Sequence, residues 1–199
     1  MGLMVHSLDN IPESARRDYF IYLLDYGWDE PISEALRRNF DKMAHESAIN
    51  KAVIIKGTVG EHFQNEVFSW HQINGLNGDA ILPALLISNN HPSYFRDNSH
   101  GTGWESGLVK ESKQPNMKLI IIPFRKFCKT STEVVELIQK VFSDIKEQKD
   151  LSDFAIAREI KKGRGNAIAD AIILEPNVAG IGIDIKKLIG RFFDKESVS

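Results

Sequence analysis

Two neighbouring segments indicate the fold class: Tyr19-Phe-Ile-Tyr-Leu-Leu24 and, shortly after it, Trp28-Asp29-Glu30-Pro31-Ile32. Residues 19–24 are aromatic and aliphatic without alternation, which is typical of a strand buried on both faces of a sheet. Pro31 fits the first turn of a helix, because a backbone N–H there has no partner within the helix. The pattern predicts a buried strand over 19–24 and a helix that begins at Pro31 and runs to about Ser47.

The rest of the first 150 residues continues this alternation of strands and helices. Short apolar runs predict three further strands, and apolar residues at helical spacing predict two further helices. The strands are expected at 52–55, 81–87 and 119–122, and the helices at 61–73 and after a cap at Thr130 or Ser131. This alternation predicts an α/β layer fold in the order βαβαββα. Residues 1–17 are expected to be a short polar lead-in.

A doubly wound sheet, flavodoxin-like or TIR-like, is the alternative to this order. It requires a helix between the third and fourth strands. Residues 91–116, which fill that interval, are rich in Gly, Ser, Asn and Pro. This composition predicts an irregular stretch and favours the first arrangement.

The sequence changes character beyond residue 150. A helix is expected over 151–162, residues 167–174 fit either a helix or a strand, and residues 183–193 have an amphipathic, basic pattern. We therefore expect two parts. An α/β domain covers residues 1–150, and a mostly helical extension over 151–199 packs on that domain or on a partner.

Three features of residues 19–148 resemble the thioredoxin-like superfamily. They are the order of the elements, the Trp28 and Pro31 frame at the start of the first long helix, and Leu82-Pro83-Ala84-Leu85. The last of these resembles the proline-then-strand segment that faces the active site in that family. The resemblance implies a mixed βαβαββα sheet flanked by helices, with a cis peptide bond before Pro83.

The chain also departs from that family. Asp29 and Ile32 stand where the family has its two redox cysteines, and without a thiolate pair dithiol exchange is impossible at that site. The loop between the third and fourth strands is longer than the family's hairpin, and residues 151–199 have no family counterpart. The resemblance therefore implies a thioredoxin-like scaffold without redox chemistry.

Composition limits where the chain acts. Its 199 residues include one cysteine, Cys128, so no disulfide forms within the chain, which favours a reducing compartment. The formal net charge of -2 gives no overall basic field for nucleic acid. Residues 1–6 lack the pattern of a signal peptide, and no apolar run approaches the ~18 residues of a membrane span. We expect a soluble cytoplasmic protein with no nucleic-acid partner and no stable membrane insertion.

The stretch 91–105 is the first candidate for chemistry. It contains His91, Asp97, His100 and Glu105, and long loops on rigid scaffolds often carry function. His91, Asp97 and His100 have the side chains of a divalent metal site, but their spacing matches no standard metal motif. A partner-binding or flexible loop is the simpler interpretation, and a metal-assisted hydrolase or transferase is the alternative.

Two further groups have both a structural and a functional interpretation. Asp29 and Glu30 suit the dipole at a helix N-terminus, or form a carboxylate pair at the position of the family's active site. Cys128 has cationic neighbours that could lower its pKa, although a lone cysteine is more often an inert core residue. His62 and His71 are expected at the surface of the second helix.

The preferred hypothesis is a non-redox binding or regulatory subunit of a protein assembly, with a protein partner or a second copy bound to it. It needs no cofactor and no metal. An apolar surface on the basic C-terminal segment should not stay exposed, which also favours a partner. The expected contact residues are Trp28, Asp29, Glu30, Pro83, Leu188, Phe192 and Phe193.

Overall fold

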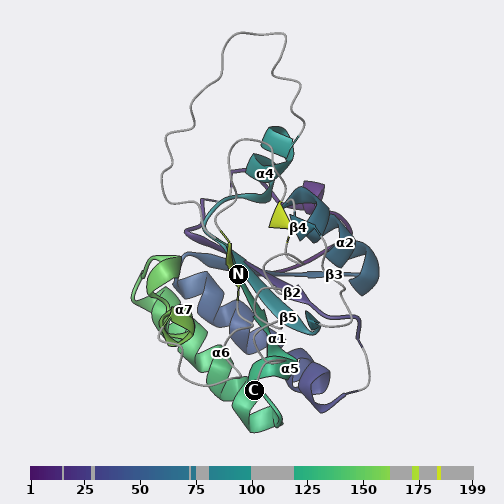
Figure 1. Cartoon of the computed structure of the whole chain (residues 1–199). Coiled ribbons are helices and arrows are strands. Elements are labelled where there is room, and N and C mark those ends of the chain that lie inside the picture. The colour runs from purple at the N-terminus through teal and green to yellow at the C-terminus, as the bar shows by residue number, and fades with distance from the viewer. Residues whose placement is uncertain are drawn as a thin grey trace, which may run out of the picture.

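A mixed β-sheet forms the centre of the molecule in the computed structural model (Figure 1). The structure describes residues 1–14, 16–27, 30–71, 73–74, 81–99, 119–161, 172–174 and 183–184. Five strands lie side by side in the order β1 (Gly2–Val5), β3 (Ala52–Gly57), β2 (Tyr19–Leu24), β5 (Ala84–Ser88), β6 (Leu119–Pro123), and the short strand β7 (Ile172–Leu174) adds to the edge at β6.

The strand directions divide the sheet into two halves. Strands β1, β3 and β2 run parallel, and β5, β6 and β7 are each antiparallel to the preceding strand in the sheet. Every residue of β2, β5 and β6 is buried, as the apolar sequence of residues 19–24 predicts for β2. The predicted α/β layer fold is therefore confirmed.

Helices cover both faces of the sheet (Figure 1). One face packs against α1 (Pro31–Ile49), α6 (Ser131–Lys146), η2 (Leu151–Asp153) and the start of α7 (Ala155–Lys161). The other face packs against η1 (Leu8–Asn10), α2 (Gly60–Trp70) and α4 (Pro92–Ser99). The short helix α5 (Phe124–Phe127) follows β6, and β4 (Ile73–Asn74) pairs with β8 (Ile183–Asp184) in a second, two-stranded sheet. Each helix of these described ranges is too short or too polar to cross a bilayer.

Two of the expected helix starts are confirmed. Helix α1 begins at Pro31, and α6 begins after the predicted cap at Thr130. Thr130 Oγ1 accepts a hydrogen bond from Glu133 N (3.3 Å), and Glu133 Oε2 accepts one from Thr130 N (3.0 Å). This capping box satisfies backbone donors that the helix itself cannot pair.

The Thr130→Ala substitution should lower the free energy of unfolding by about 1 kcal/mol, because it removes this cap. Urea denaturation of the full chain measures the loss. The matched control is Thr132→Ala, on an exposed residue in the same first turn of α6. Equal losses in the two variants would contradict the capping role.

The prediction that residues 1–17 form a short polar lead-in is wrong. Residues 2–5 form β1 beside β3, and Leu8 and Ile11 are buried against the sheet. Glu66 of α2 holds this segment, because its Oε2 accepts a hydrogen bond from Leu8 N (2.8 Å). Four apolar residues were too short a signal to reveal a strand that a distant neighbour stabilises.

The prediction of an irregular stretch over residues 91–116 is also wrong at the start of that range, where α4 lies between β5 and β6. His91 Nδ1 accepts a hydrogen bond from Ser93 N (3.2 Å), and Tyr94 N donates to His91 O (3.1 Å), so His91 caps this helix. The Leu82–Pro83 peptide bond is cis, as the resemblance implies. In the mostly helical extension expected beyond residue 150, the described parts include two strands, β7 and β8.

Candidate functional site

The sequence-predicted residues Glu30 and Pro83 lie at one end of the sheet. Strand β2 ends at Leu24, which is paired with Ala84 at the start of β5, and Ala84 is paired with Pro123 at the end of β6. The loop before α1, the proline before β5 and the first turn of α5 therefore meet at this end. We call Glu30, Pro31, Pro83, Phe124 and Arg125 the candidate edge.

An ion pair joins two elements at the candidate edge. Arg125 Nη2 lies 2.6 Å from Glu30 Oε1, and Arg125 Nε donates to Glu30 Oε2 at 3.2 Å. This two-point contact fixes the planar guanidinium against the carboxylate. Glu30 is also the N-cap residue of α1, and its carbonyl accepts the first helical hydrogen bond from Glu34 N (2.9 Å). The Glu30 carboxylate is therefore held in one orientation at the start of α1.

Backbone contacts fix the rest of the candidate edge. Phe124 N donates to Pro83 O (2.8 Å), and Ser131 Oγ donates to Pro31 O (3.3 Å). The start of α1, the Pro83 segment and the turn after β6 are thus connected through residues far apart in the sequence. Pro83 and Phe124 are buried, whereas Glu30, Pro31 and Arg125 reach the surface, where they present one carboxylate and one guanidinium.

The substitution Arg125→Ala should change the free energy of unfolding by less than about 1 kcal/mol, because an ion pair of this exposure contributes little to stability. The Arg125 side chain is 31% exposed and the Glu30 side chain 37%. Thermal and urea unfolding of the full chain measure the change. A loss of several kcal/mol would show that the pair supports the fold and would rule out edge variants as binding probes.

The only cysteine of the chain is unsuited to redox chemistry. Cys128 is 2% exposed and follows α5. Burial, with the charges of Glu133 and Glu136, raises the pKa of its thiol to about 12. The suggestion that neighbouring cations activate Cys128 is therefore wrong, because the thiolate would be almost absent at neutral pH.

His91 lies at the opposite end of the sheet from the candidate edge. Its ring packs edge-on against Phe20 at the start of β2, with 5.2 Å between ring centroids. The Asp97 backbone belongs to α4, while its side chain, His100 and Glu105 lie outside what the structure describes. Within the described residues, no cluster of three or more His, Cys, Asp or Glu side chains could hold a metal ion.

Several expected contact residues also lie outside the described part of the chain: Trp28, Asp29, Leu188, Phe192 and Phe193. Conversely, Arg125 was not recognised as a site residue. One sequence feature could have indicated Arg125: it lies just after a buried strand. That strand ends on the same side of the sheet as the loop before α1. His62 is exposed as expected, but His71 is completely buried, so the surface position expected for it is wrong.

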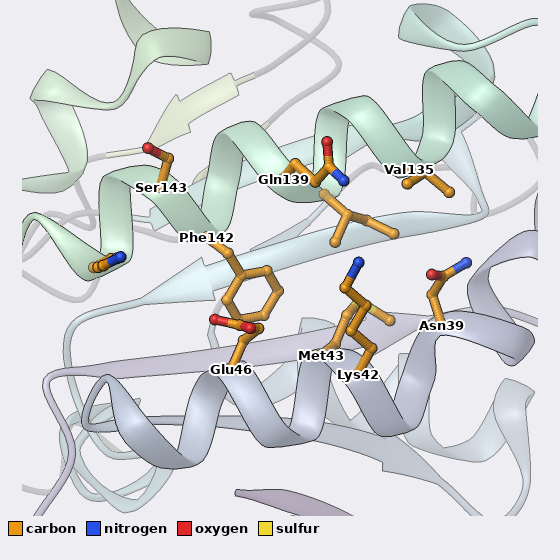
Figure 2. Close-up of a pocket in the computed structure, with 10 residues that line it drawn as sticks. Asn39, Lys42, Met43, Glu46, Val135, Gln139, Phe142 and Ser143 are labelled. Carbon is orange, nitrogen blue, oxygen red and sulfur yellow. The ribbon is translucent and has the colours of Figure 1, made fainter.

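A groove of about 350 Å³ lies between α1 and α6 (Figure 2). Phe142 reaches from α6 toward Glu46 of α1, and Met43 lies beside it on α1. Met43 and Phe142 are buried, while Lys42 on the rim is exposed. None of the lining residues belongs to the candidate edge, so the groove is a separate surface feature.

Comparison with protein-family models, curated proteins and solved structures gives no match to this chain.

Proposed function

We propose that this chain is a non-redox, thioredoxin-like protein that acts as a binding or regulatory subunit in a protein assembly. The observation that carries the proposal is the Glu30–Arg125 ion pair at the candidate edge. At the candidate edge, the Glu30 carboxylate and the Arg125 guanidinium lie where the resemblance implies the redox site of the family. They are fixed groups suited to recognition, and the chain's one thiol is buried elsewhere.

The arrangement of the strands supports the thioredoxin-like part of the proposal. Residues 19–146 contain a mixed sheet with helices on both faces, and the elements α1 and α6 pack on the same face. The resemblance also implies that the Pro83 segment faces the start of the first long helix. Pro83 and Glu30 lie at the same end of the sheet, connected through Phe124 and Arg125.

The shape of the candidate edge supports binding over catalysis. Arg125 donates to both oxygens of the Glu30 carboxylate, and this two-point contact holds the two groups in a defined geometry. Both side chains remain about one third exposed, so a partner can reach them. Charged groups of this kind at the rim of an interface select the partner and guide its approach.

Site-specific photo-crosslinking in the native host tests this proposal. A photo-reactive residue replaces Lys126, which is exposed and adjacent to Arg125. We expect one discrete crosslinked product, with another protein or with a second copy of the chain. The control carries the same residue at Gln139, in the α1–α6 groove. A product from position 139 alone, or from neither position, would contradict a partner at the candidate edge.

A further inference from the structure

Strand β1 lies at one edge of the six-stranded sheet. It pairs with β3 on one side, and within the described residues no strand pairs with its other side. Sheet edges are often protected by charged side chains or proline, because unpaired backbone groups there can pair with another chain. Residues 2–5 read Gly-Leu-Met-Val, so the sequence of β1 gives this edge neither protection.

The hydrogen bonds to β3 show which backbone groups of β1 point outward. Met1 O accepts a hydrogen bond from Ile54 N at 2.9 Å, and the same register continues to Val5. In a parallel pair, alternate residues direct both of their backbone groups to the same neighbouring strand. Residues 1, 3 and 5 therefore bond to β3, and the N–H and C=O groups of Gly2 and Met4 point away from the sheet.

Apolar side chains lie on both faces of the sheet at this edge. A Cβ atom at Gly2 would lie 2.5 Å from Ala44 Cβ, so position 2 faces α1, and Met4 shares that face. Met4 is 60% exposed, an unusual position for a large apolar side chain. Leu3 points to the opposite face, where it is only partly buried against the core. A partner at this edge would therefore cover apolar surface on both faces.

The outward backbone groups are symmetric about Leu3, which makes the edge complementary to itself. In an antiparallel pair of two β1 strands, Gly2 of each copy lies opposite Met4 of the other. Each copy then contributes two N–H and two C=O groups, which form four hydrogen bonds. Leu3 lies opposite its own copy on the two-fold axis. The long Met4 side chain faces a glycine, beside which it can pack against Ala44 and Phe40.

The start of β1 carries a positive charge. Burial and the nearby charge of Arg17 lower the pKa of the Met1 amino group to about 6, so this group is largely neutral at pH 7. Met1 N donates to Ala52 O (3.2 Å), which places Lys51 beside this end of β1. Asp18 is joined to Lys51 by a backbone hydrogen bond of 2.8 Å. The two cations and this carboxylate sum to one positive charge.

The end of β1 carries a negative charge. The His6 ring stacks on His62 in the first turn of α2, with 5.2 Å between the centroids, and the exposed Glu61 precedes His62. The carboxylate of Glu66 accepts a hydrogen bond from the segment that follows β1. With neutral histidines, these two carboxylates and Lys56 of β3 sum to one negative charge. Antiparallel pairing brings the start of one β1 to the end of the other, so the charges attract.

We propose that two copies of this chain associate through β1, as an antiparallel pair of edge strands around a two-fold axis at Leu3. The pairing joins the two sheets into one continuous sheet. It shares no residue with the candidate edge, so it is independent of the partner proposed there. Because two four-residue strands bury less surface than a standard interface, we expect a dissociation constant of about 10 to 100 µM.

Sedimentation equilibrium of the purified full chain, at protein concentrations from about 1 µM to about 1 mM, tests the proposal. We expect an equilibrium between monomer and dimer. Met4→Pro should weaken the dimer at least about tenfold, because it removes an outward N–H donor and leaves the hydrogen bonds to β3 intact. The matched control Met4→Ala keeps that N–H and should weaken the dimer less.

The variant Arg125→Glu separates this proposal from the partner at the candidate edge. It should leave the dimer intact. A monomer at every concentration, or a dimer that Met4→Pro does not weaken, would overturn the proposal. A dimer that Arg125→Glu breaks would also overturn it, because that dimer would form through the candidate edge.

Disulfide crosslinking tests the register, and it decides the matter if Met4→Pro fails to fold. In a Cys128→Ala background, Leu3→Cys should form a disulfide between two copies. Residues opposite each other in a non-hydrogen-bonded pair have Cα atoms about 4.5 Å apart, within the range for a disulfide. Met4→Cys should crosslink far more slowly, because the two copies of position 4 are offset along the strands. Crosslinking at position 4 as fast as at position 3, or at neither position, would contradict the pairing.

Discussion

Acidification from pH 6.5 to pH 4 should lower the free energy of unfolding by about 3 kcal/mol through His71 alone. Burial lowers the pKa of His71 to about 4, although Nδ1 lies 2.7 Å from Val67 O. The ring lies between Tyr22 and Phe95, with centroid distances of 5.0 and 4.3 Å, so water does not reach it.

The direction of this change in stability follows from the protonation of His71 in the folded and unfolded chains. In the unfolded chain His71 takes up a proton below its ordinary pKa of about 6.5, whereas in the folded chain it stays neutral until about pH 4. The unfolded state therefore binds more protons between these values, and stability falls as the pH falls. Well below pH 4 both states are protonated, and the contribution of His71 no longer changes with pH.

Urea denaturation at several pH values between 7 and 4 measures this effect. Other groups titrate in the same range, so the His71 contribution is the difference between the wild type and His71→Phe, which keeps an aromatic ring in the core. The control His62→Phe changes an exposed histidine that stacks on His6. It should keep the wild-type pH dependence. Identical pH dependence in His71→Phe and the wild type would contradict the prediction.

The Asp144→Ala substitution should lower the free energy of unfolding by about 3 kcal/mol, because Asp144 joins α6 to α7 from a buried position. Its side chain is 3% exposed. Oδ1 accepts from Lys149 Nζ and Oδ2 from Ala155 N, both at 2.6 Å. Removal of the carboxylate leaves the Ala155 N–H at the start of α7 without this acceptor.

Equilibrium urea unfolding also measures this loss. Asp153→Ala is the matched control, because Asp153 is an exposed aspartate of the neighbouring η2 turn. It should change stability by less than about 0.5 kcal/mol. Equal effects of the two substitutions would mean that Asp144 does not hold α7 against α6.

Local sequence patterns predicted two kinds of element: those stabilised by residues close in the sequence, and those whose residues are all apolar. Residues 19–24 are buried on both faces, so the strand was recognisable from composition alone. The cap at Thr130 was recognisable because the residue that completes it, Glu133, is three positions away. The α/β class followed from a series of such segments.

The features that sequence patterns missed depend on distant partners. Strand β1 needs β3 for its hydrogen bonds, about fifty residues away, and His71 is buried by Tyr22 and Phe95. Periodicity within α2 carries no information about those rings. The candidate edge shows the same limit. Glu30 was predicted as a contact residue, but its partner Arg125 is 95 positions away and only the sheet brings the two together.

Native mass spectrometry of the chain, purified gently from its native host, tests whether it is a binding subunit. We expect a stoichiometric complex with another protein or a second copy. We also expect that Arg125→Glu, which reverses the charge beside Glu30, releases that partner while Lys42→Glu retains it. A wild-type chain recovered only as a free monomer, or a complex unchanged by Arg125→Glu, would show that the chain does not bind a partner through the candidate edge.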